Sequence, residues 1–243
     1  MKIAISGKGG TGKTTFSAHL ARVFVDRGYN VYAVDADPDA NLAFMLDIKE
    51  EVKPLSQLEE VIQDRVGGDG GMFSLNPEVD DVLQEYSIQQ DGISFLRMGS
   101  VKKASSSCYC AENSFLRAVL NSLVFRSDDA VILDMGAGIE HLTRGTAAGV
   151  DVMLVVCEPT PVSVETAHVI EGLADEAGIG EVSFIGNKIM NERQKEFLRE
   201  NLPETPLAFV NYDETLLSLN GNNSSEAILG AAEDVLENLI GGG

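Results

Sequence analysis

Cysteines and long apolar runs are both scarce in this sequence of 243 residues. Its 3 cysteines suit a reducing compartment and not a disulfide framework, so we expect a cytoplasmic protein. The opening stretch MKIAISGKGG turns glycine-rich too early for a signal peptide. No apolar run approaches the roughly 18 residues that span a bilayer. These shortages argue against a disulfide-stapled secreted domain and against a membrane-spanning protein.

Basic residues are also few, because 18 Lys and Arg stand against 38 Asp and Glu. The resulting net charge of −20 would repel DNA and RNA, and no local basic run offsets it. An anionic membrane surface would be repelled in the same way. We therefore expect neither nucleic acid nor membrane as a partner.

Short apolar runs alternate along the chain with longer segments of helical periodicity. The predicted strands are 2–6, 31–35, 93–98, 130–134, 151–157, 182–187 and 207–210. The predicted helices are near 14–27, 55–65, 112–125, 141–148, 162–177, 191–201 and 224–239. Most strands are apolar without alternation, which is typical of strands covered on both faces. The order predicts an α/β fold with a doubly wound, mainly parallel sheet, whose ligands bind beyond the carboxyl ends of the strands.

We expect one domain over residues 1–243, because the sequence shows neither a repeat nor a low-complexity linker. A chain of this length can bury about 70% of its unfolded surface without staples. The acidic stretch 47–92 interrupts the alternation of strands and helices. We interpret it as a surface excursion from the sheet.

The stretch GKGGTGKTT (7–15) matches the phosphate-binding pattern G-x-x-x-x-G-K-T, directly after a predicted strand and before a predicted helix. In such a P-loop, Lys13 would reach the β- and γ-phosphates of ATP or ADP, and the Thr14 hydroxyl would bind Mg²⁺. The helix would add its positive N-terminal end. The residues predicted to form this loop are Gly7, Lys8, Gly9, Gly10, Thr11, Gly12, Lys13, Thr14 and Thr15. The sequence therefore predicts a P-loop NTPase.

A second lysine in the loop, Lys8, resembles the deviant Walker A lysine of the MinD/ParA/nitrogenase-iron-protein class of ATPases. In that class the equivalent lysine contacts the nucleotide of the partner subunit, so the resemblance implies an ATP-dependent homodimer. Asp37, in VDADPDANL, matches the switch I aspartate that, in this class, positions or deprotonates the attacking water. The pattern D-x-x-x-G in LDMGAG matches switch II, which implies that Asp134 holds Mg²⁺ through a water and that the Gly138 N–H donates to the γ-phosphate.

Four further positions are interpreted with less support from a motif. Asn187, in IGNKI, resembles the asparagine that reads the adenine edge, although a helix cap or a turn is the rival interpretation. Cys157 ends an apolar strand and is predicted to be a core thiol. His19 and His168 lie inside predicted helices without the spacing of metal ligands.

Two of the 3 cysteines, Cys108 and Cys110, lie close together in SSSCYCAEN, and their spacing calls for an explanation. Two thiolates leave a tetrahedral Zn²⁺ site incomplete, but the twofold axis of a dimer would supply two more. Ni²⁺ could use the same four sulfurs in a square-planar arrangement. The alternative is a pair of idle thiols. On the metal interpretation, 108–110 is a C-x-C metal loop, and ATP and metal would each stabilise the dimer that the other needs.

Taken together, GKGGTGKTT, VDADPD, CYCAENSFL and VILDMGAGIEHLTRGTA resemble the CooC-type accessory ATPases of carbon monoxide dehydrogenase maturation. The resemblance implies slow, Mg²⁺-dependent, switch-type ATP hydrolysis and delivery of Ni²⁺ to the nickel–iron–sulfur cluster of that enzyme. The stretch FVNYD (209–213) departs from the family, which tends to carry a proline there against the adenine. An electron carrier or cluster scaffold like the nitrogenase iron protein is one alternative. A partitioning or septum-positioning module is the other.

Overall fold

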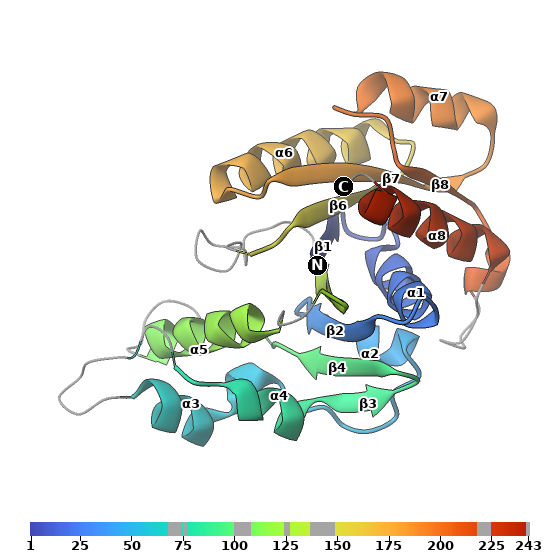
Figure 1. The fold of residues 1–243 in the computed structure, drawn as a ribbon. Coiled ribbons are helices and arrows are strands. Elements are labelled where there is room, and N and C mark those ends of the chain that lie inside the picture. The colour runs from blue at the N-terminus through green and yellow to red at the C-terminus, as the bar shows by residue number, and fades with distance from the viewer. Residues whose placement is uncertain are drawn as a thin grey trace.

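Eight strands form one sheet in the computed structural model, which describes residues 1–67, 74, 77–99, 108–123, 127–136, 149–217 and 225–241. The strand order is β3-β4-β2-β5-β1-β6-β7-β8, and every neighbouring pair is parallel except β3 and β4 (Figure 1). The strands are β1 (Lys2–Gly7), β2 (Asn30–Ala36), β3 (Ile88–Gln90), β4 (Ile93–Arg97), β5 (Asp129–Met135), β6 (Val152–Cys157), β7 (Glu181–Ile189) and β8 (Ala208–Asn211). The predicted single-domain α/β fold with a mainly parallel sheet is confirmed.

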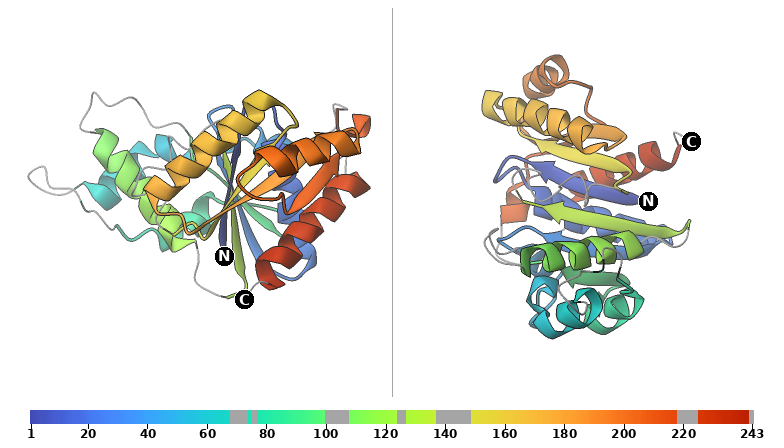
Figure 2. Two further views of the ribbon diagram at one scale, coloured as in Figure 1. Left: turned by 90° about the horizontal axis from the view of Figure 1, so that it is seen from above. Right: turned by 90° about the vertical axis from the view of Figure 1, so that its left-hand side faces the viewer.

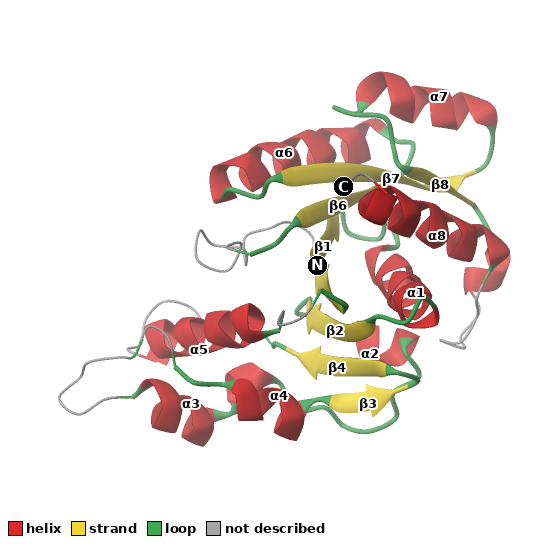
Figure 3. Ribbon diagram, viewed as in Figure 1, coloured by secondary structure: helices red, strands yellow, loops and turns green. Residues whose placement is uncertain are grey.

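Helices cover both faces of this sheet, as the views in Figures 2 and 3 show. One face carries α1 (Lys13–Asp26), α2 (Leu42–Met45) and α8 (Glu226–Gly241). The other carries η1 (Leu55–Gln57), α3 (Glu59–Val66), α4 (Asp80–Tyr86), α5 (Cys108–Ser122), α6 (Pro161–Ala177) and α7 (Glu192–Asn201). A 3₁₀ turn, η3 (Glu214–Leu217), precedes α8. No helix in the described ranges is long and apolar enough to cross a membrane.

Two separate hydrophobic cores explain why the strands read as unbroken apolar runs. Side chains alternate between the faces of a strand, and in β1 Ile3 and Ile5 join the α1 core whereas Ala4 joins the α5 core. The same alternation divides Leu154 from Val155 in β6. Because each face is buried under helices, both sets of positions are apolar.

The segment 47–92 is not a surface excursion as predicted. Its described residues form η1, α3, α4 and β3. Most of their buried apolar side chains lie in the same core as those of α5, whereas Ile48 and Val52 lie in the α1 core. Leu58, Ile62 and Val66 are buried at helical spacing, whereas Glu59 and Glu60 on α3 are exposed. The acidic composition that suggested a solvated excursion belongs to the outer face of an amphipathic helix.

Helix α5 begins at Cys108, four residues before its predicted start, so 108–110 form a first helical turn and not a loop. The side chains of Cys108 and Cys110 lie outside the described part of the structure, as do the predicted helix 141–148 and Gly138. Since α5 connects two parallel strands, β4 and β5, it starts at the carboxyl edge of the sheet.

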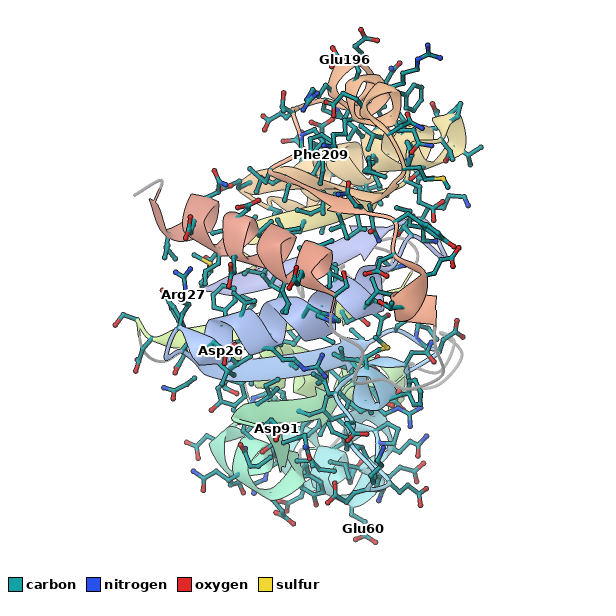
Figure 4. The ribbon with its side chains drawn as sticks, turned by 90° about the vertical axis from the view of Figure 1, so that its right-hand side faces the viewer. Asp26, Arg27, Glu60, Asp91, Glu196 and Phe209 are labelled. Carbon is teal, nitrogen blue, oxygen red and sulfur yellow. The ribbon has the colours of Figure 1, made fainter. Side chains whose placement is uncertain are left out.

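Surface contacts connect outer helices to one another and to the sheet. Arg27 at the end of α1 donates to Glu237 of α8 at 3.2 Å, and the two helices lie side by side in Figure 4. Phe209 of β8 lies beneath α7, where the Arg199 guanidinium is 5.1 Å from its ring centre. Exposed pairs of these kinds contribute at most about 1 kcal/mol each, so the buried cores carry most of the stability.

Candidate functional site

The predicted P-loop joins β1 to α1 at the centre of the sheet, and two of its glycines have no room for a side chain. Gly7 has φ +145°, and a Cβ atom there would lie 2.4 Å from the carbonyl oxygen of Val156 in β6. Gly12 has φ +94°, and its Cβ would lie 2.4 Å from the amide nitrogen of Asn187. The loop therefore packs closely against Val156 of β6 and Asn187 of β7, and neither glycine could be replaced without a shift of its neighbour.

The first turn of α1 opens onto the carboxyl edge of the sheet. Gly12 is the N-cap residue of the helix and has a left-handed backbone conformation. In the described structure, no side chain makes a capping hydrogen bond to this turn. Its N–H groups are thus available to an anion, and the helix dipole favours negative charge at this point. Thr14 and Thr15 lie half-buried in this turn.

Lys13 is 6% exposed, and its ammonium group lies inside the loop. Lys13 Nζ donates to the Lys8 carbonyl at 3.3 Å, and the same oxygen accepts from the Thr11 hydroxyl at 2.9 Å and the Thr11 N–H at 3.3 Å. Burial lowers the pKa of Lys13, whereas the charges of Asp134, Asp37 and Asp39 act to raise it. The ammonium group of Lys13 thus points at the backbone of its own loop.

Asp134, near the end of β5, is fully buried beneath the start of α1. Its Oδ1 accepts from the Ser17 hydroxyl at 2.8 Å, whereas Oδ2 has no hydrogen-bond partner in the described structure. Burial raises its pKa to about 6, although the hydroxyls of Thr14 and Ser17 and the charge of Lys13 act to lower it. A buried carboxylate oxygen beside a threonine hydroxyl and a lysine is a suitable ligand for a hard cation.

Asp37 follows β2 and lies against the end of β5. Its Oδ1 accepts from the Asp39 N–H at 2.9 Å. A Cβ atom at Gly136 would lie 3.3 Å from Pro38 and 3.6 Å from Asp37 Oδ1. The two acidic loops that were predicted separately are therefore in contact with each other.

Asp35 organises the first of these loops and was missed in the sequence. It is fully buried, and its two oxygens accept from the N–H groups of Asp37 at 3.2 Å and Leu42 at 3.1 Å. Burial raises its pKa to about 7, and the charge of Asp134, its register partner in β5, acts in the same direction. A charged residue inside an otherwise apolar predicted strand was the signal that could have identified it.

Asn187 and Lys188, at the end of β7, contact the P-loop from the side. Asn187 Nδ2 donates to the Thr11 carbonyl at 2.7 Å, and its Oδ1 accepts the N–H of Lys188 at 2.8 Å. Lys188 Nζ donates to the Gly10 carbonyl at 2.6 Å and to Glu158 at 2.5 Å. The sequence analysis predicted a contact of Asn187 with the adenine edge, which stays a prediction, and it missed Lys188 and Glu158.

A cavity of about 500 Å³ lies just beyond the ends of β7 and β8. Its lining includes Met190, Asn191, Asn211 and Tyr212. The last two belong to the stretch 209–213 that departs from the resembled family, so an amide and an aromatic ring stand near the expected position of the proline.

The cysteines divide into one described thiol and two that are not described. Cys157 is fully buried, as predicted, and burial raises its pKa to about 12. No group of three or more His, Cys, Asp or Glu side chains that could hold a metal occurs among the described residues. Glu112, one helical turn after Cys108, is 5% exposed, and its Oε2 finds no hydrogen-bond partner in the ranges described.

The chain is similar in sequence to known nucleotide-binding proteins. Residues 2–225 match the family described as the CobQ/CobB/MinD/ParA nucleotide binding domain. An uncharacterized ATP-binding protein of Methanocaldococcus jannaschii is 40% identical over 89% of this chain and 87% of its own length. The carbon monoxide dehydrogenase accessory protein CooC of Rhodospirillum rubrum is 39% identical over 85% of this chain and 81% of its own length.

Two solved structures show the same fold. The cell division ATPase MinD of Pyrococcus furiosus has a TM-score of 0.71 at 24% identity, over 97% of this chain and 98% of that one. The septum site-determining protein MinD of Pyrococcus horikoshii, solved with Mg-ADP, has a TM-score of 0.71 at 21% identity, over 99% and 98%. With the P-loop, the two acidic loops and the family match in agreement, the chain belongs to the CobQ/CobB/MinD/ParA family of nucleotide-binding P-loop proteins.

Proposed function

We propose that this chain is a Mg²⁺-dependent, switch-type ATPase whose ATP- and metal-linked homodimer delivers nickel during the maturation of a carbon monoxide dehydrogenase. The likeness to CooC of Rhodospirillum rubrum supports the dehydrogenase link. The observation that carries the proposal is topological: α1 starts after β1 and α5 after β4, so the P-loop and the C-x-C turn lie at one edge of the sheet.

Phosphate binding uses groups that the loop already directs inward. Lys13 Nζ and the Thr11 N–H both reach the Lys8 carbonyl at 3.3 Å, which is long for a hydrogen bond. A phosphate oxygen carries more negative charge than a carbonyl and would bind these donors more strongly. The Lys8 side chain, on this proposal, reaches the nucleotide of the partner subunit.

The residues around Asp134 fit a magnesium ion. The unpartnered Oδ2 of Asp134 and the hydroxyl of Thr14 are oxygen ligands of the kind Mg²⁺ prefers, and Ser17 fixes the other carboxylate oxygen. When bound, Mg²⁺ would neutralise charge that develops on the β- and γ-phosphates.

For hydrolysis, a water molecule would lie between the Asp37 carboxylate and the γ-phosphate. The carboxylate of Asp37 accepts a hydrogen bond from that water and directs its oxygen at the phosphorus. The new P–O bond forms as the bond to the ADP oxygen breaks, and the water's proton leaves with the inorganic phosphate. Asp35 holds the backbone of this loop through the N–H of Asp37, and Gly138 is expected to contact the γ-phosphate.

The metal is cargo, either Ni²⁺ or Zn²⁺, bound by Cys108 and Cys110 of both subunits. Residues two apart on a regular helix point about 200° apart, so both thiolates of one chain would meet one ion only if the first turn of α5 opened. Glu112 supports a cation near this turn, because a buried carboxylate oxygen without a partner is unfavourable unless positive charge lies close by.

Sedimentation tests the proposal directly. The protein is examined alone, with Mg-ATP, with Ni²⁺ or Zn²⁺, and with nucleotide and metal together, and metal is measured per dimer. We expect a dimer with one metal ion when both are present, and loss of the metal in Cys108→Ala/Cys110→Ala. A chain that stays monomeric when saturated with both, or a double variant that binds metal as the wild type does, would contradict the proposal.

A further inference from the structure

Two consecutive residues of β7 contact the P-loop, which a regular strand does not allow. Side chains at neighbouring positions of a strand point to opposite faces. Here the pairing of β7 with β8 shifts register between Gly186 and Ile189, and Lys188 has φ +58°. This bulge turns Asn187 and Lys188 to the same side, where their nitrogens reach the carbonyls of Thr11 at 2.7 Å and Gly10 at 2.6 Å.

These two contacts fix the direction of backbone N–H groups in the loop. A trans peptide is planar, so its N–H points opposite to its C=O. Because the Thr11 carbonyl points at Asn187, the N–H of Gly12 is turned away from β7. Because the Gly10 carbonyl points at Lys188, the N–H of Thr11 is turned the other way, toward the Lys8 carbonyl inside the loop. An anion-binding loop needs its N–H groups turned to one side in this manner.

The ammonium group of Lys188 is held by a second partner. Glu158 follows β6, and its Oε1 lies 2.5 Å from Lys188 Nζ. The Glu158 N–H in turn donates to the Ser163 hydroxyl of α6 at 3.0 Å. The left-handed conformation of Lys188 is unusual for a lysine and persists where its surroundings determine it. Asn187, Lys188 and Glu158 thus connect the ends of β6 and β7 to the loop after β1.

We propose that Asn187 and Lys188, with Glu158, are positioning residues for phosphate binding: they orient the Gly10–Thr11 and Thr11–Gly12 peptides toward the phosphates. The inference rests on the proposed nucleotide site. The role it assigns to Asn187 concerns the loop and does not depend on the base. The contacts with Thr11 and Lys188 use one N–H and one lone pair of the amide, so one of each stays available for adenine.

Binding of Mg-pyrophosphate and of adenosine, compared by calorimetry, separates the two roles, because one probe has no base and the other no phosphate. We expect Asn187→Ala and Lys188→Met each to weaken Mg-pyrophosphate and Mg-ADP about 5- to 30-fold, as for a lost hydrogen bond of intermediate strength. Adenosine affinity should change by less than about twofold, which is within the usual effect of a distant substitution. Lys49→Met, at an exposed lysine away from the P-loop, is the matched control and should leave all three affinities unchanged.

Three results would overturn the inference. Unchanged pyrophosphate affinity in folded Asn187→Ala and Lys188→Met would remove the positioning role. Loss of adenosine affinity alone in Asn187→Ala would make that residue a base reader. A Lys188→Gln variant that binds pyrophosphate as poorly as Lys188→Met would indicate a direct contact of the lysine charge with phosphate, because glutamine retains a donor for the Gly10 carbonyl.

If the wild type binds neither Mg-ADP nor Mg-pyrophosphate, the proposed function fails before the inference is tested. If Lys188→Met does not fold, Lys188→Ala takes its place: a loss of about 5- to 30-fold in Mg-pyrophosphate affinity supports the inference, whereas wild-type affinity contradicts it.

Discussion

Asp35 and Asp134 occupy register-paired positions in β2 and β5, and both carboxyls are fully buried. Burial raises the pKa of Asp35 to about 7 and that of Asp134 to about 6. Because folding raises both pKa values, the native state holds more protons than the unfolded chain between about pH 4 and pH 7. The free energy of unfolding should therefore fall as the pH rises through this window.

Asp35→Asn tests the larger of these contributions. The variant removes one titrating carboxyl, so its unfolding free energy should fall less steeply between pH 4.5 and 7.5, by at most about 1.4 kcal/mol per pH unit relative to the wild type. Urea unfolding at several pH values measures the slope. Asp26→Asn, at an exposed position, should leave the slope unchanged. Equal slopes in Asp35→Asn and the wild type would show that Asp35 does not titrate in this window.

Gly12 and Gly28 form a matched pair for the packing of the P-loop. Both have left-handed φ angles, +94° and +86°, but a Cβ at Gly28 meets nothing within 4 Å, whereas one at Gly12 meets the Asn187 amide. We expect Gly12→Ala to reduce the free energy of unfolding by about 1–3 kcal/mol more than Gly28→Ala, because overpacking adds to the same backbone strain. Chemical denaturation measures both, and equal losses would mean that the amide of Asn187 moves aside freely.

At the scale of elements, α5 carries the proposed metal turn and a buried acid. Glu112→Gln keeps the shape of the side chain and removes its charge. The metal-free variant should be more stable than the wild type by about 1 kcal/mol, since a neutral amide is easier to bury than a carboxylate. Its affinity for Ni²⁺ or Zn²⁺ should fall several-fold, as measured by competition with a chelator. Gain of stability without loss of metal affinity would separate Glu112 from the metal.

The elements also show what a sequence can and cannot predict. The central strands were predicted because two buried faces make continuous apolar runs. β3 was missed because it is a three-residue edge strand, Ile-Gln-Gln, with little apolar signal. The bulge that redirects Lys188 has no local pattern, since it depends on pairing with β8. Asp35 was passed over because its partners, two backbone N–H groups, are visible only once the loop is folded.

At the scale of the whole molecule, charge opposes self-association. Each chain carries a net charge of −20, so two chains that approach one another repel. Several large apolar side chains are nonetheless exposed in segments that follow the carboxyl ends of strands. Met190 and Tyr212 come directly after β7 and β8, Val162 lies in the first turn of α6 after β6, and Phe44 lies in α2 after β2. Apolar contact at this edge would favour the proposed dimer, and long-range repulsion would oppose it.

Salt should therefore strengthen the ATP-linked dimer. Raising the ionic strength from about 0.01 M to about 0.15 M shortens the screening length from about 30 Å to about 8 Å, which weakens the repulsion between chains more than contacts at short range. Sedimentation equilibrium with Mg-ATP at the two salt concentrations measures the change. Dissociation at the higher salt concentration would indicate that ion pairs, and not apolar contacts, hold the subunits together.

The separation of the two cores bears on how nucleotide binding at the P-loop could be coupled to the C-x-C turn. α1 begins at the P-loop and lies on one face of the sheet, whereas α5 begins at the C-x-C turn and lies on the other. The sheet separates the α1 core from the α5 core. We expect a conformational change on triphosphate binding to reach α5 through the loops at the carboxyl edge of the sheet, while the strands keep their positions.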